Sequence, residues 1–463
     1  MAGTAILAAC GGGGGQATTA ALAQATQQAA SKPTTPPAAG ATTVATAAMA
    51  GGATTGGAAA TGTTSAPAMA LAGSATIQFW TRFDFLKPAI DQYNDQAQKA
   101  GKKVFVNVTT IPGAQIIDKL ITALASKTQP DMMSIDLVQC PYFNSLGAFV
   151  DATARFNSLP YKGEFSKSQT SLGNYKGKQY QVPFSADVSA FLWNKDIFRE
   201  AGLDPEKGPT NWDELRQFAQ KTTKAPDRYG IAFDAQTGGT FMFRWMPFVW
   251  SNGGDILSAE GTKSTINSPQ ALEALQFWVD LVQKDKVTPP GTATFSGDDL
   301  RAAFQAGKIA MMVNGNAIVA QINRDAPNVK YGTSLIPASP KTGVNASFAG
   351  GDLVGILAGT KMEEQCWDLV QYLTSDAVQI DYFAKNGVVP VRTGAYKNKY
   401  FDAEPKYQVF PKALDVARTP FTLKYNRLYD ALQANLQSAL AGQKPAQQAL
   451  MEIEAAHNKL LSE

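Results

Sequence analysis

The first 75 residues of this 463-residue chain lack aromatic and acidic residues altogether. They contain no Phe, Trp, Tyr, Asp or Glu, and Lys32 is their one charged side chain. A segment built from Ala, Gly, Thr, Gln and Pro buries too little apolar surface to offset the chain entropy that folding removes. We therefore predict a disordered linker over residues 11–75 and a folded part that begins at residue 76.

The chain as a whole also lacks a strong charge of either sign. Its 41 Lys and Arg residues against 38 Asp and Glu residues give a formal net charge of +3, which excludes the basic surface of a nucleic-acid-binding protein. It contains no apolar run of 18 residues or more, so we expect no membrane-spanning helix. It has no phosphate-binding glycine loop, zinc-protease motif or calcium loop, and we predict neither a cofactor nor a metal.

The three cysteines are scattered, and none has the close spacing of a zinc or redox motif. Cys10 ends the apolar run Leu7-Ala8-Ala9 and precedes Gly11, and this tetrapeptide resembles the lipobox of bacterial lipoproteins. The resemblance implies that residues 1–10 are a lipoprotein signal remnant, with Cys10 carrying a lipid that anchors the chain to the membrane. A signal peptide has a basic start and a longer apolar stretch, so we expect the translation start upstream of Met1.

The folded part opens with alternating strand and helix patterns. Residues 76–80, 103–108 and 132–135 have strand periodicity, and helical patterns at 87–100 and 114–126 separate them. This order predicts an α/β fold with a parallel sheet and helices on both faces. Ligands of such sheets bind beyond the carboxyl ends of the strands. Those ends carry Trp80 and Asp84 after the first strand and Asp136 after the third.

Helix start and stop signals continue to the end of the chain. Asn211 with Glu214 and Ser268 with Pro269 have the pattern of helix N-termini, and residues 309–313 form a further apolar strand. Two more helices are predicted at 426–441 and 446–461. A folded part of this length exceeds what one core usually holds, so we predict two α/β lobes.

Several motifs in a fixed order carry a family resemblance. They lie at 129–133, 177–187, 193–205, 211–215, 250–255, 307–315 and 350–352. With them, residues 76–463 resemble the extracellular solute-binding proteins of bacterial ABC importers, the sugar-binding family that includes maltose-binding proteins. The resemblance implies two Rossmann-like lobes of the periplasmic-binding-protein type II, joined by hinge crossovers around a ligand cleft. It places lobe one at 76–185 plus 316–360 and lobe two at 186–315 plus 361–463, with crossings near 183–187, 313–316 and 359–364.

Sugar recognition combines flat aromatic faces with carboxylates and amides that hydrogen-bond hydroxyl groups. Residues of both kinds fall at the predicted strand ends and crossings, and glycines there allow a close backbone approach. The candidate ligand-binding residues are Trp80, Asp84, Asp136, Asp187, Trp250, Asn252, Asn314, Gly351, Asp352, Arg392 and Tyr425.

The resemblance predicts a monomeric, extracytoplasmic binding component that closes over a mono- or oligosaccharide and delivers it to the permease subunits of an importer. Two alternatives remain open. The same carboxylates would serve a cationic solute such as a polyamine, and a secreted carbohydrate-active enzyme also combines tryptophans with carboxylates. The sequence singles out no catalytic pair, which favours a protein that is not an enzyme. The single histidine, His457, is predicted to lie on the surface of the last helix.

Overall fold

The computed structural model describes residue 70 and residues 72–463. The predicted lipidation site, Cys10, and most of the predicted linker lie outside these residues. Within them, every helix is too short or too polar to cross a membrane.

One mixed sheet runs through the described part of the molecule in the order β2-β1-β3-β10-β6-β8-β7, with β11 beside β10 and β9 beside β6. A separate hairpin joins β4 to β5. The strands are β1 (Ala75–Thr81), β2 (Val104–Thr110), β3 (Met132–Asp136), β4 (Asn174–Tyr175), β5 (Lys178–Gln179), β6 (Gln181–Asn194), β7 (Tyr229–Ile231), β8 (Ile309–Gly315), β9 (Tyr331–Ser334), β10 (Ser347–Ile356) and β11 (Ala417–Arg418).

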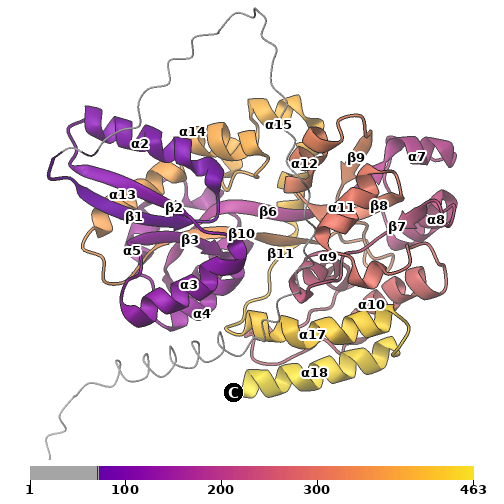
Figure 1. Ribbon diagram of the computed structural model, residues 1–463. Helices are drawn as coiled ribbons and strands as arrows, with labels where there is room; N and C mark the ends of the chain where they lie inside the picture. The colour runs from indigo at the N-terminus through magenta and orange to yellow at the C-terminus, as the bar shows by residue number, and fades with distance from the viewer. Residues whose placement is uncertain (1–69, 71) are drawn as a thin grey trace, which may run out of the picture.

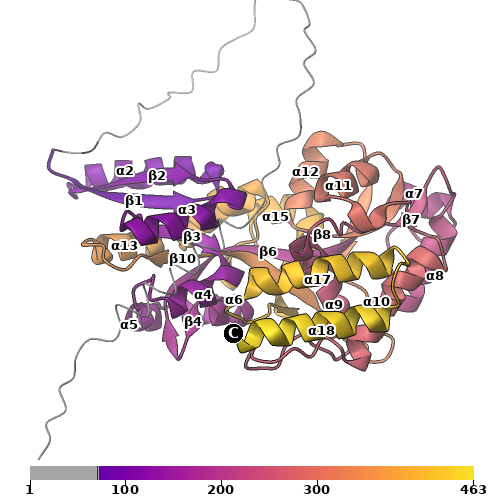
Figure 2. The same cartoon turned by 60° about the horizontal axis from the view of Figure 1, so that its bottom comes forward.

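Helices flank this sheet along its whole length (Figures 1 and 2). They are α2 (Lys87–Lys99), α3 (Gly113–Ser126), α4 (Cys140–Ser145), α5 (Thr153–Ser158), α6 (Lys167–Leu172), α7 (Lys195–Glu200), α8 (Trp212–Thr222), α9 (Gly238–Ser251), α10 (Pro269–Gln283), α11 (Gly297–Gln305), α12 (Ala317–Asp325), α13 (Glu363–Leu373), α14 (Asp376–Val378), α15 (Lys399–Ala403), α16 (Val409–Asp415), α17 (Tyr425–Leu440) and α18 (Ala446–Ser462).

The first lobe has the predicted β-α-β-α-β order. Strand β1 pairs in parallel with both β2 and β3, which confirms the predicted parallel pairing for these three strands, whereas β10 pairs antiparallel to β3 and makes the whole sheet mixed. Alternate residues of β1 face opposite sides, because successive side chains of a strand point to opposite faces of the sheet. Ile77 and Phe79 pack with the α2 side, whereas Trp80 packs with the cluster that contains α3 residues such as Leu120. Figure 1 shows α2 and α3 on opposite sides of β1.

Strand β6 connects the two lobes. Its amino-terminal part pairs with β10, and its carboxyl-terminal part pairs with β8 and β9. The strand is buried along nearly its whole length, as expected of a strand covered on both faces. Asp187, in the middle of β6, is its one residue that is not fully buried. The predicted crossing at 183–187 therefore lies within this strand.

Strand β10 is a second connection, and it differs from the sequence-based expectation. It pairs with β11 at one end and with β3 at the other, so the chain enters the first lobe along β10 rather than crossing near 359–364. Helix α13 then contacts β10 and α2 in the first lobe, whereas the expected division assigned it to the second. Strand β9 pairs with the end of β6 in the second lobe, whereas it was expected in the first. Strand pairing decides these positions, and motif spacing does not reveal it.

The helix caps of the second lobe follow the sequence closely. Asn211 Oδ1 accepts the backbone N–H of Glu214 at 3.0 Å. The Glu214 carboxylate accepts a hydrogen bond from the backbone N–H of Thr210 at 2.7 Å rather than from that of Asn211, so the capping box is incomplete. Ser296 and Asp299 form a complete capping box on α11.

The last two helices form an antiparallel hairpin beside the second lobe (yellow in Figures 1 and 2). Helix α17 contacts α9, and α18 contacts α10. The prediction of a surface His457 is wrong, because its side chain is fully buried between these helices and a neighbouring loop. Its Nε2 lies 2.9 Å from the carbonyl of Leu428 and its Nδ1 lies 3.4 Å from Ser264 Oγ. Burial lowers the pKa of this imidazole.

Candidate ligand-binding site

An arginine that the sequence did not single out organises the junction of the lobes. Arg82 follows β1 and lies 2.5 Å from the Asp352 carboxylate of β10 and 3.7 Å from the Asp136 carboxylate at the end of β3. Burial works to lower the pKa of Arg82, but Asp352 and Asp136 outweigh it and raise the pKa above its usual range. The parallel order of β1 and β3 brings Arg82 and Asp136 to the same edge of the sheet.

Asp352 is the buried partner of this pair. Its side chain has no exposed surface, and its second oxygen accepts a hydrogen bond from Ser134 Oγ at 3.1 Å. Burial raises the pKa of Asp352 to about 6, although Arg82 opposes the shift. Gly351 beside it has a φ of +107°, and a Cβ there would overlap the carbonyl of Ser185. The predicted close approach at Gly351 is therefore made to strand β6.

Asp187 occupies the centre of the junction. Burial raises the pKa of its carboxyl group, and the nearby Arg82 and Arg244 oppose that shift from opposite lobes. Among the described residues, its Oδ1 has no hydrogen-bond partner although the atom is buried. Any side chain at Gly315 would overlap this carboxylate, so the glycine leaves room for it. A buried acceptor without a partner costs free energy, unless a ligand supplies the missing donor.

The second lobe contributes a buried ion pair behind Asp187. Arg244 on α9 lies 2.8 Å from the Asp234 carboxylate and donates to the carbonyl of Val313 at 2.9 Å. A longer contact of 3.4 Å reaches Asn314 Oδ1. Burial raises the pKa of Asp234 to about 6 against the effect of Arg244. The pair fixes the N-terminal part of α9 against the end of β8, where Asn314 lies.

Two aromatic residues at this junction were not anticipated. Phe243 is the one residue from Phe241 to Ser251 of α9 that is not buried, and its ring lies 3.6 Å from the Cβ position of Gly350 beside Asp187. Tyr429 on α17 is buried, and its hydroxyl has no hydrogen-bond partner in the part of the chain that the structure describes. Burial raises the pKa of Tyr429, and the nearby Asp136 raises it further.

The structure therefore brings together four of the predicted residues: Asp136, Asp187, Asn314 and Asp352. We call these four, with Arg82, Asp234, Phe243, Arg244 and Tyr429, the junction cluster. Its charged groups are four carboxylates and two guanidinium groups, so carboxylates are in excess. The signal for Arg82 was present in the sequence, since it directly follows a strand end. No local signal marks Phe243 or Tyr429, because contacts between distant segments place them.

Three other predicted residues are not part of this cluster, although Tyr425 lies beside it. Trp80 is half-buried against α3, with Lys119 Nζ 4.6 Å from its ring centre, and it lines a surface hollow of about 420 Å³. Asp84 is exposed just after β1. Tyr425 lies next to Tyr429, with ring centres 3.8 Å apart, but it is buried at the start of α17.

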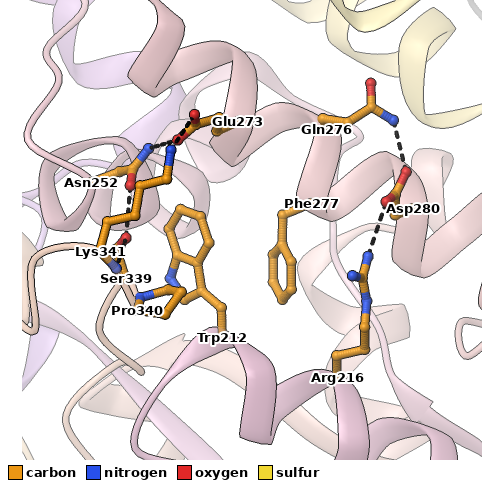
Figure 3. Close-up of a pocket in the computed structure, with 10 residues that line it drawn as sticks. All are labelled: Trp212, Arg216, Asn252, Glu273, Gln276, Phe277, Asp280, Ser339, Pro340 and Lys341. Carbon is orange, nitrogen blue, oxygen red and sulfur yellow. Dashed lines mark hydrogen bonds and ion pairs between the residues drawn. The ribbon is translucent and has the colours of Figure 1, made fainter.

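Trp250 and Asn252 have structural partners in the second lobe. Trp250 is buried, and its indole N–H donates to Asp255 at 3.1 Å. Asn252 bonds to Glu273 at 2.8 Å and to Ser339 at 2.7 Å. It lines a hollow of about 360 Å³ in this lobe, together with Trp212 and Phe277 (Figure 3). These hydrogen bonds connect elements of the second lobe, and neither Trp250 nor Asn252 belongs to the junction cluster.

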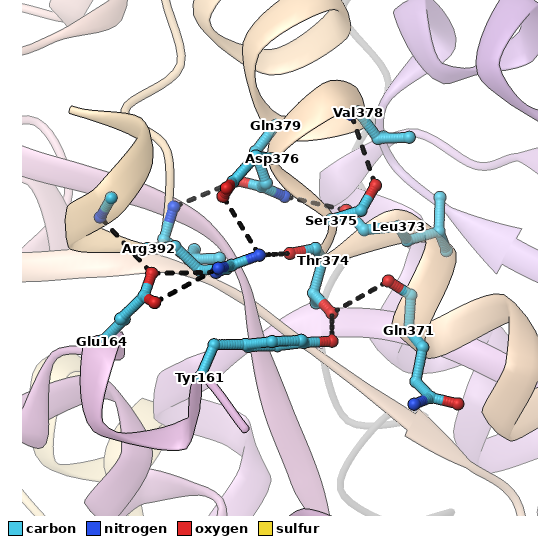
Figure 4. Close-up of polar contacts among 12 residues, drawn as sticks. Tyr161, Glu164, Gln371, Leu373, Thr374, Ser375, Asp376, Val378, Gln379 and Arg392 are labelled. Carbon is cyan, nitrogen blue, oxygen red and sulfur yellow. Dashed lines mark hydrogen bonds and ion pairs between the residues drawn. The ribbon is translucent and has the colours of Figure 1, made fainter. Parts of the chain in front are cut away.

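Arg392 belongs to a separate polar network (Figure 4). Its guanidinium forms two hydrogen bonds with the Glu164 carboxylate at 3.0 and 3.2 Å. It also lies 3.0 Å from the Asp376 carboxylate and 4.0 Å from the centre of the Tyr161 ring. Glu164, Asp376 and Tyr161 contact the Arg392 guanidinium from different sides. We call Arg392, Glu164, Asp376 and Tyr161 the Arg392 network.

Within the described residues, no group of three or more His, Cys, Asp or Glu side chains is arranged to hold a metal ion. Cys140 and Cys366 are both free and buried.

Comparison with known proteins supports this picture. The sequence profile of bacterial extracellular solute-binding proteins matches residues 88–409. A binding protein of Brucella abortus (strain 2308) is 26% identical over 382 residues, covering 81% of this chain and 90% of that protein. The sn-glycerol-3-phosphate-binding periplasmic protein of Brucella melitensis biotype 1 is 26% identical over 306 residues, covering 62% of this chain and 68% of its own.

A solved structure extends the likeness to the fold. The cyclic alpha-maltosyl-1,6-maltose binding protein of Arthrobacter globiformis is similar to this chain with a TM-score of 0.75 and 26% identity. The match covers 84% of this chain and 99% of that one. The predicted family resemblance and the predicted type II architecture of two α/β lobes are thereby confirmed.

Proposed function

The chain belongs to the bacterial extracellular solute-binding protein family, and we propose that it captures a neutral sugar between its lobes and delivers it to the permease of an ABC importer. The ligand is a mono- or oligosaccharide, bound and released without chemical change. The observation that carries this proposal is the set of unpaired polar atoms in the junction cluster, next to a half-buried aromatic ring.

Arg82 Nε, Asp187 Oδ1 and Tyr429 Oη have no hydrogen-bond partner within the described chain. The other cluster atoms without one are oxygens of Asp234 and Asp352, whose carboxylates are ion-paired with Arg244 and Arg82. The first three atoms come from the first lobe, the connecting strand and the C-terminal hairpin. Sugar hydroxyl groups both donate and accept hydrogen bonds, so a single polyol satisfies an N–H, a carboxylate oxygen and a phenol together. The half-buried ring of Phe243 offers an apolar surface that suits the C–H side of a sugar ring. The two kinds of contact together match a carbohydrate.

The charges of the cluster favour a neutral ligand over a phosphorylated one. Four carboxylates surround two arginines, and each arginine already has a carboxylate within 2.8 Å. A phosphate would have to displace these carboxylates from the arginines and approach the negatively charged carboxylate of Asp187. A phosphorylated ligand such as sn-glycerol 3-phosphate, which one relative is named for binding, is therefore less suitable for this chain. The same excess of carboxylates would attract a polyamine, so the ligand panel below includes spermidine.

Closure of the lobes is the mechanism that this arrangement supports. Asp187 lies on the strand that both lobes share, Arg82 on one side and Arg244 on the other. A ligand that bonds to residues of both lobes binds the closed form more tightly than the open form, and so shifts the population toward closure. The permease then recognises the closed form.

The location follows from the family and from Cys10. An extracellular solute-binding protein functions outside the cytoplasm, and we propose that Cys10 carries a lipid that holds the chain at the cell membrane. Residues 11–75 would then act as a tether, with a root-mean-square reach of roughly 40–50 Å if flexible. We propose that the protein functions as a monomer.

Thermal unfolding in the presence of separate ligands tests the substrate class. The panel is maltose, maltotriose, glucose, sn-glycerol 3-phosphate and spermidine, each titrated to millimolar concentration. A ligand at 100 times its dissociation constant stabilises the folded state by about 2.7 kcal/mol, so true binding gives a clear shift of the midpoint. We expect a shift with at least one sugar. The absence of a shift with every sugar of the panel would overturn the proposal, and a shift with spermidine or sn-glycerol 3-phosphate would then identify the ligand class.

A further inference from the structure

Two side chains join the lobes at the rim of the junction cluster. Gln139 of the first lobe donates from Nε2 to Asn426 Oδ1 at 2.8 Å. Asn426 donates back from Nδ2 to Gln139 Oε1 at 3.4 Å. Gln139 ends the 3-10 turn Leu137–Gln139 after β3, and Asn426 lies in the first turn of α17. The two amides therefore form a reciprocal pair between residues that are 287 positions apart.

Helix α17 is fixed to the second lobe, so this pair spans the two lobes. Gln437 donates to the carbonyl of Ala235 at 2.7 Å, and Gln433 donates to the carbonyl of Gln236. Gly238, at the start of α9, lies so close that a Cβ there would be 2.5 Å from the carbonyl oxygen of Tyr429. Movement of the second lobe relative to the first must therefore carry α17 with it and separate Asn426 from Gln139.

The same two elements carry junction-cluster residues. Asp136 caps the 3-10 turn, with its Oδ1 accepting the N–H of Val138 at 3.3 Å, three residues before Gln139. On α17, Tyr429 follows Asn426 by three residues, a spacing that places both on one face of a helix. The turn thus presents Asp136 and Gln139 to the face of α17 that presents Tyr429 and Asn426. The position of the amide pair and that of the cluster depend on each other.

We infer that Gln139 and Asn426 are positioning residues that form a clasp, which holds the lobes closed and keeps the Tyr429 hydroxyl beside Asp136 when a ligand is bound. The inference rests on the proposed function, since a clasp has a role only in a protein that opens and closes. The inference gives the C-terminal hairpin of α17 and α18 a role in closure of the two lobes. Loss of the clasp leaves the ligand contacts in place and shortens the time that the closed form lasts.

The test is a double-mutant cycle with Gln139→Ala, Asn426→Ala and the double variant in the full chain, with maltose as the probe. Two neutral hydrogen bonds contribute about 1–2 kcal/mol together, so we expect maltose to dissociate about tenfold faster from the double variant. Each single variant is expected to show nearly the full effect, because each removes the whole pair. Asp430→Ala, an exposed position on the same helix, is the matched control and leaves the rate unchanged.

A second readout needs no ligand. Spin labels on the exposed positions Asp118→Cys of α3 and Lys221→Cys of α8 report the distance between the lobes by double electron–electron resonance. In the double variant, we expect the short-distance population to fall. Failure of every panel sugar to bind the wild type would overturn the proposed function, while the label distances still test the clasp. Unchanged label distances, or unchanged dissociation where maltose binds, would overturn the clasp alone.

Discussion

Two polar clusters of this molecule have similar composition but differ in how completely their polar atoms are paired. The Arg392 network places an arginine between Glu164 and Asp376, and its guanidinium is hydrogen-bonded to Glu164, paired with Asp376 and covered by the Tyr161 ring (Figure 4). The junction cluster also combines arginines with carboxylates. There, Arg82 Nε, Asp187 Oδ1 and Tyr429 Oη find no partner within the described residues.

The difference separates a structural network from a binding site. A satisfied network gains its full hydrogen-bond energy on folding and holds elements together. An unsatisfied one costs free energy in the folded protein, and this cost is recovered when a ligand supplies the missing partners. Residue type alone does not distinguish the two, since both contain an arginine with two carboxylate neighbours.

The largest effect is expected at Asp187. Asp187→Ala removes the unpaired acceptor and lowers sugar affinity by about 100-fold, because a hydrogen bond to a charged group contributes up to about 3 kcal/mol. The folded protein retains its stability or gains some, since burial of this carboxylate is costly. Calorimetric titration and thermal unfolding measure the two quantities. Asp84→Ala, at an exposed carboxylate outside the cluster, is the control, and equal affinity in wild type and D187A would remove Asp187 from the site.

The Arg392 network should respond in the opposite way. Arg392→Ala breaks the bonds to Glu164 and Asp376 and lowers the free energy of unfolding by about 2–3 kcal/mol, with sugar affinity within about twofold of wild type. Arg155→Ala provides the comparison, because its partners Glu363 and Glu364 are exposed and such pairs contribute less than about 1 kcal/mol. Denaturant unfolding gives both values. A large loss of affinity in R392A would place Arg392 in the binding site after all.

A smaller effect is expected at the Tyr429 hydroxyl. Tyr429→Phe removes one oxygen and leaves the ring packing unchanged, so sugar affinity falls about five- to tenfold through one lost hydrogen bond. Stability does not fall, since the hydroxyl has no partner within the described residues. Tyr425→Phe on the same helix serves as the matched variant and keeps its affinity. If Y429F binds sugar as wild type does, Tyr429 has only a packing role.

The smallest effect concerns pH. The pKa of Asp352 is raised to about 6 in the folded protein, above its ordinary value in an unfolded chain. The folded state therefore binds a proton more readily, and this group's contribution to stability grows as the pH falls from 7 to 5, by about 1 kcal/mol. Comparison of wild type with Asp352→Asn by denaturant unfolding at both pH values isolates this contribution. An identical pH dependence in the two proteins would contradict the raised pKa.

The strand ends explain which site residues the sequence could predict. Asp136, Asn314 and Asp352 lie within or at the end of apolar strands, and Asp187 interrupts one, so each is conspicuous as a polar residue in an apolar pattern. In a sheet of this kind such positions converge at the junction of the lobes. Trp80 and Trp250 were equally conspicuous by residue type. Their packing against α3 and within the second lobe follows from three-dimensional neighbours that residue type does not encode.

The sequence by itself determined the α/β alternation, the two-lobed architecture and the family, because strand and helix periodicity, caps and ordered motifs are local properties. The tertiary structure decided which polar groups would remain unpaired. That outcome depends on contacts between segments hundreds of residues apart, such as Gln139 with Asn426. Hydrogen-bond satisfaction is a property of such contacts. Only the folded chain therefore separates Asp187, Tyr429 and Phe243 at the junction from Arg392 in its closed network.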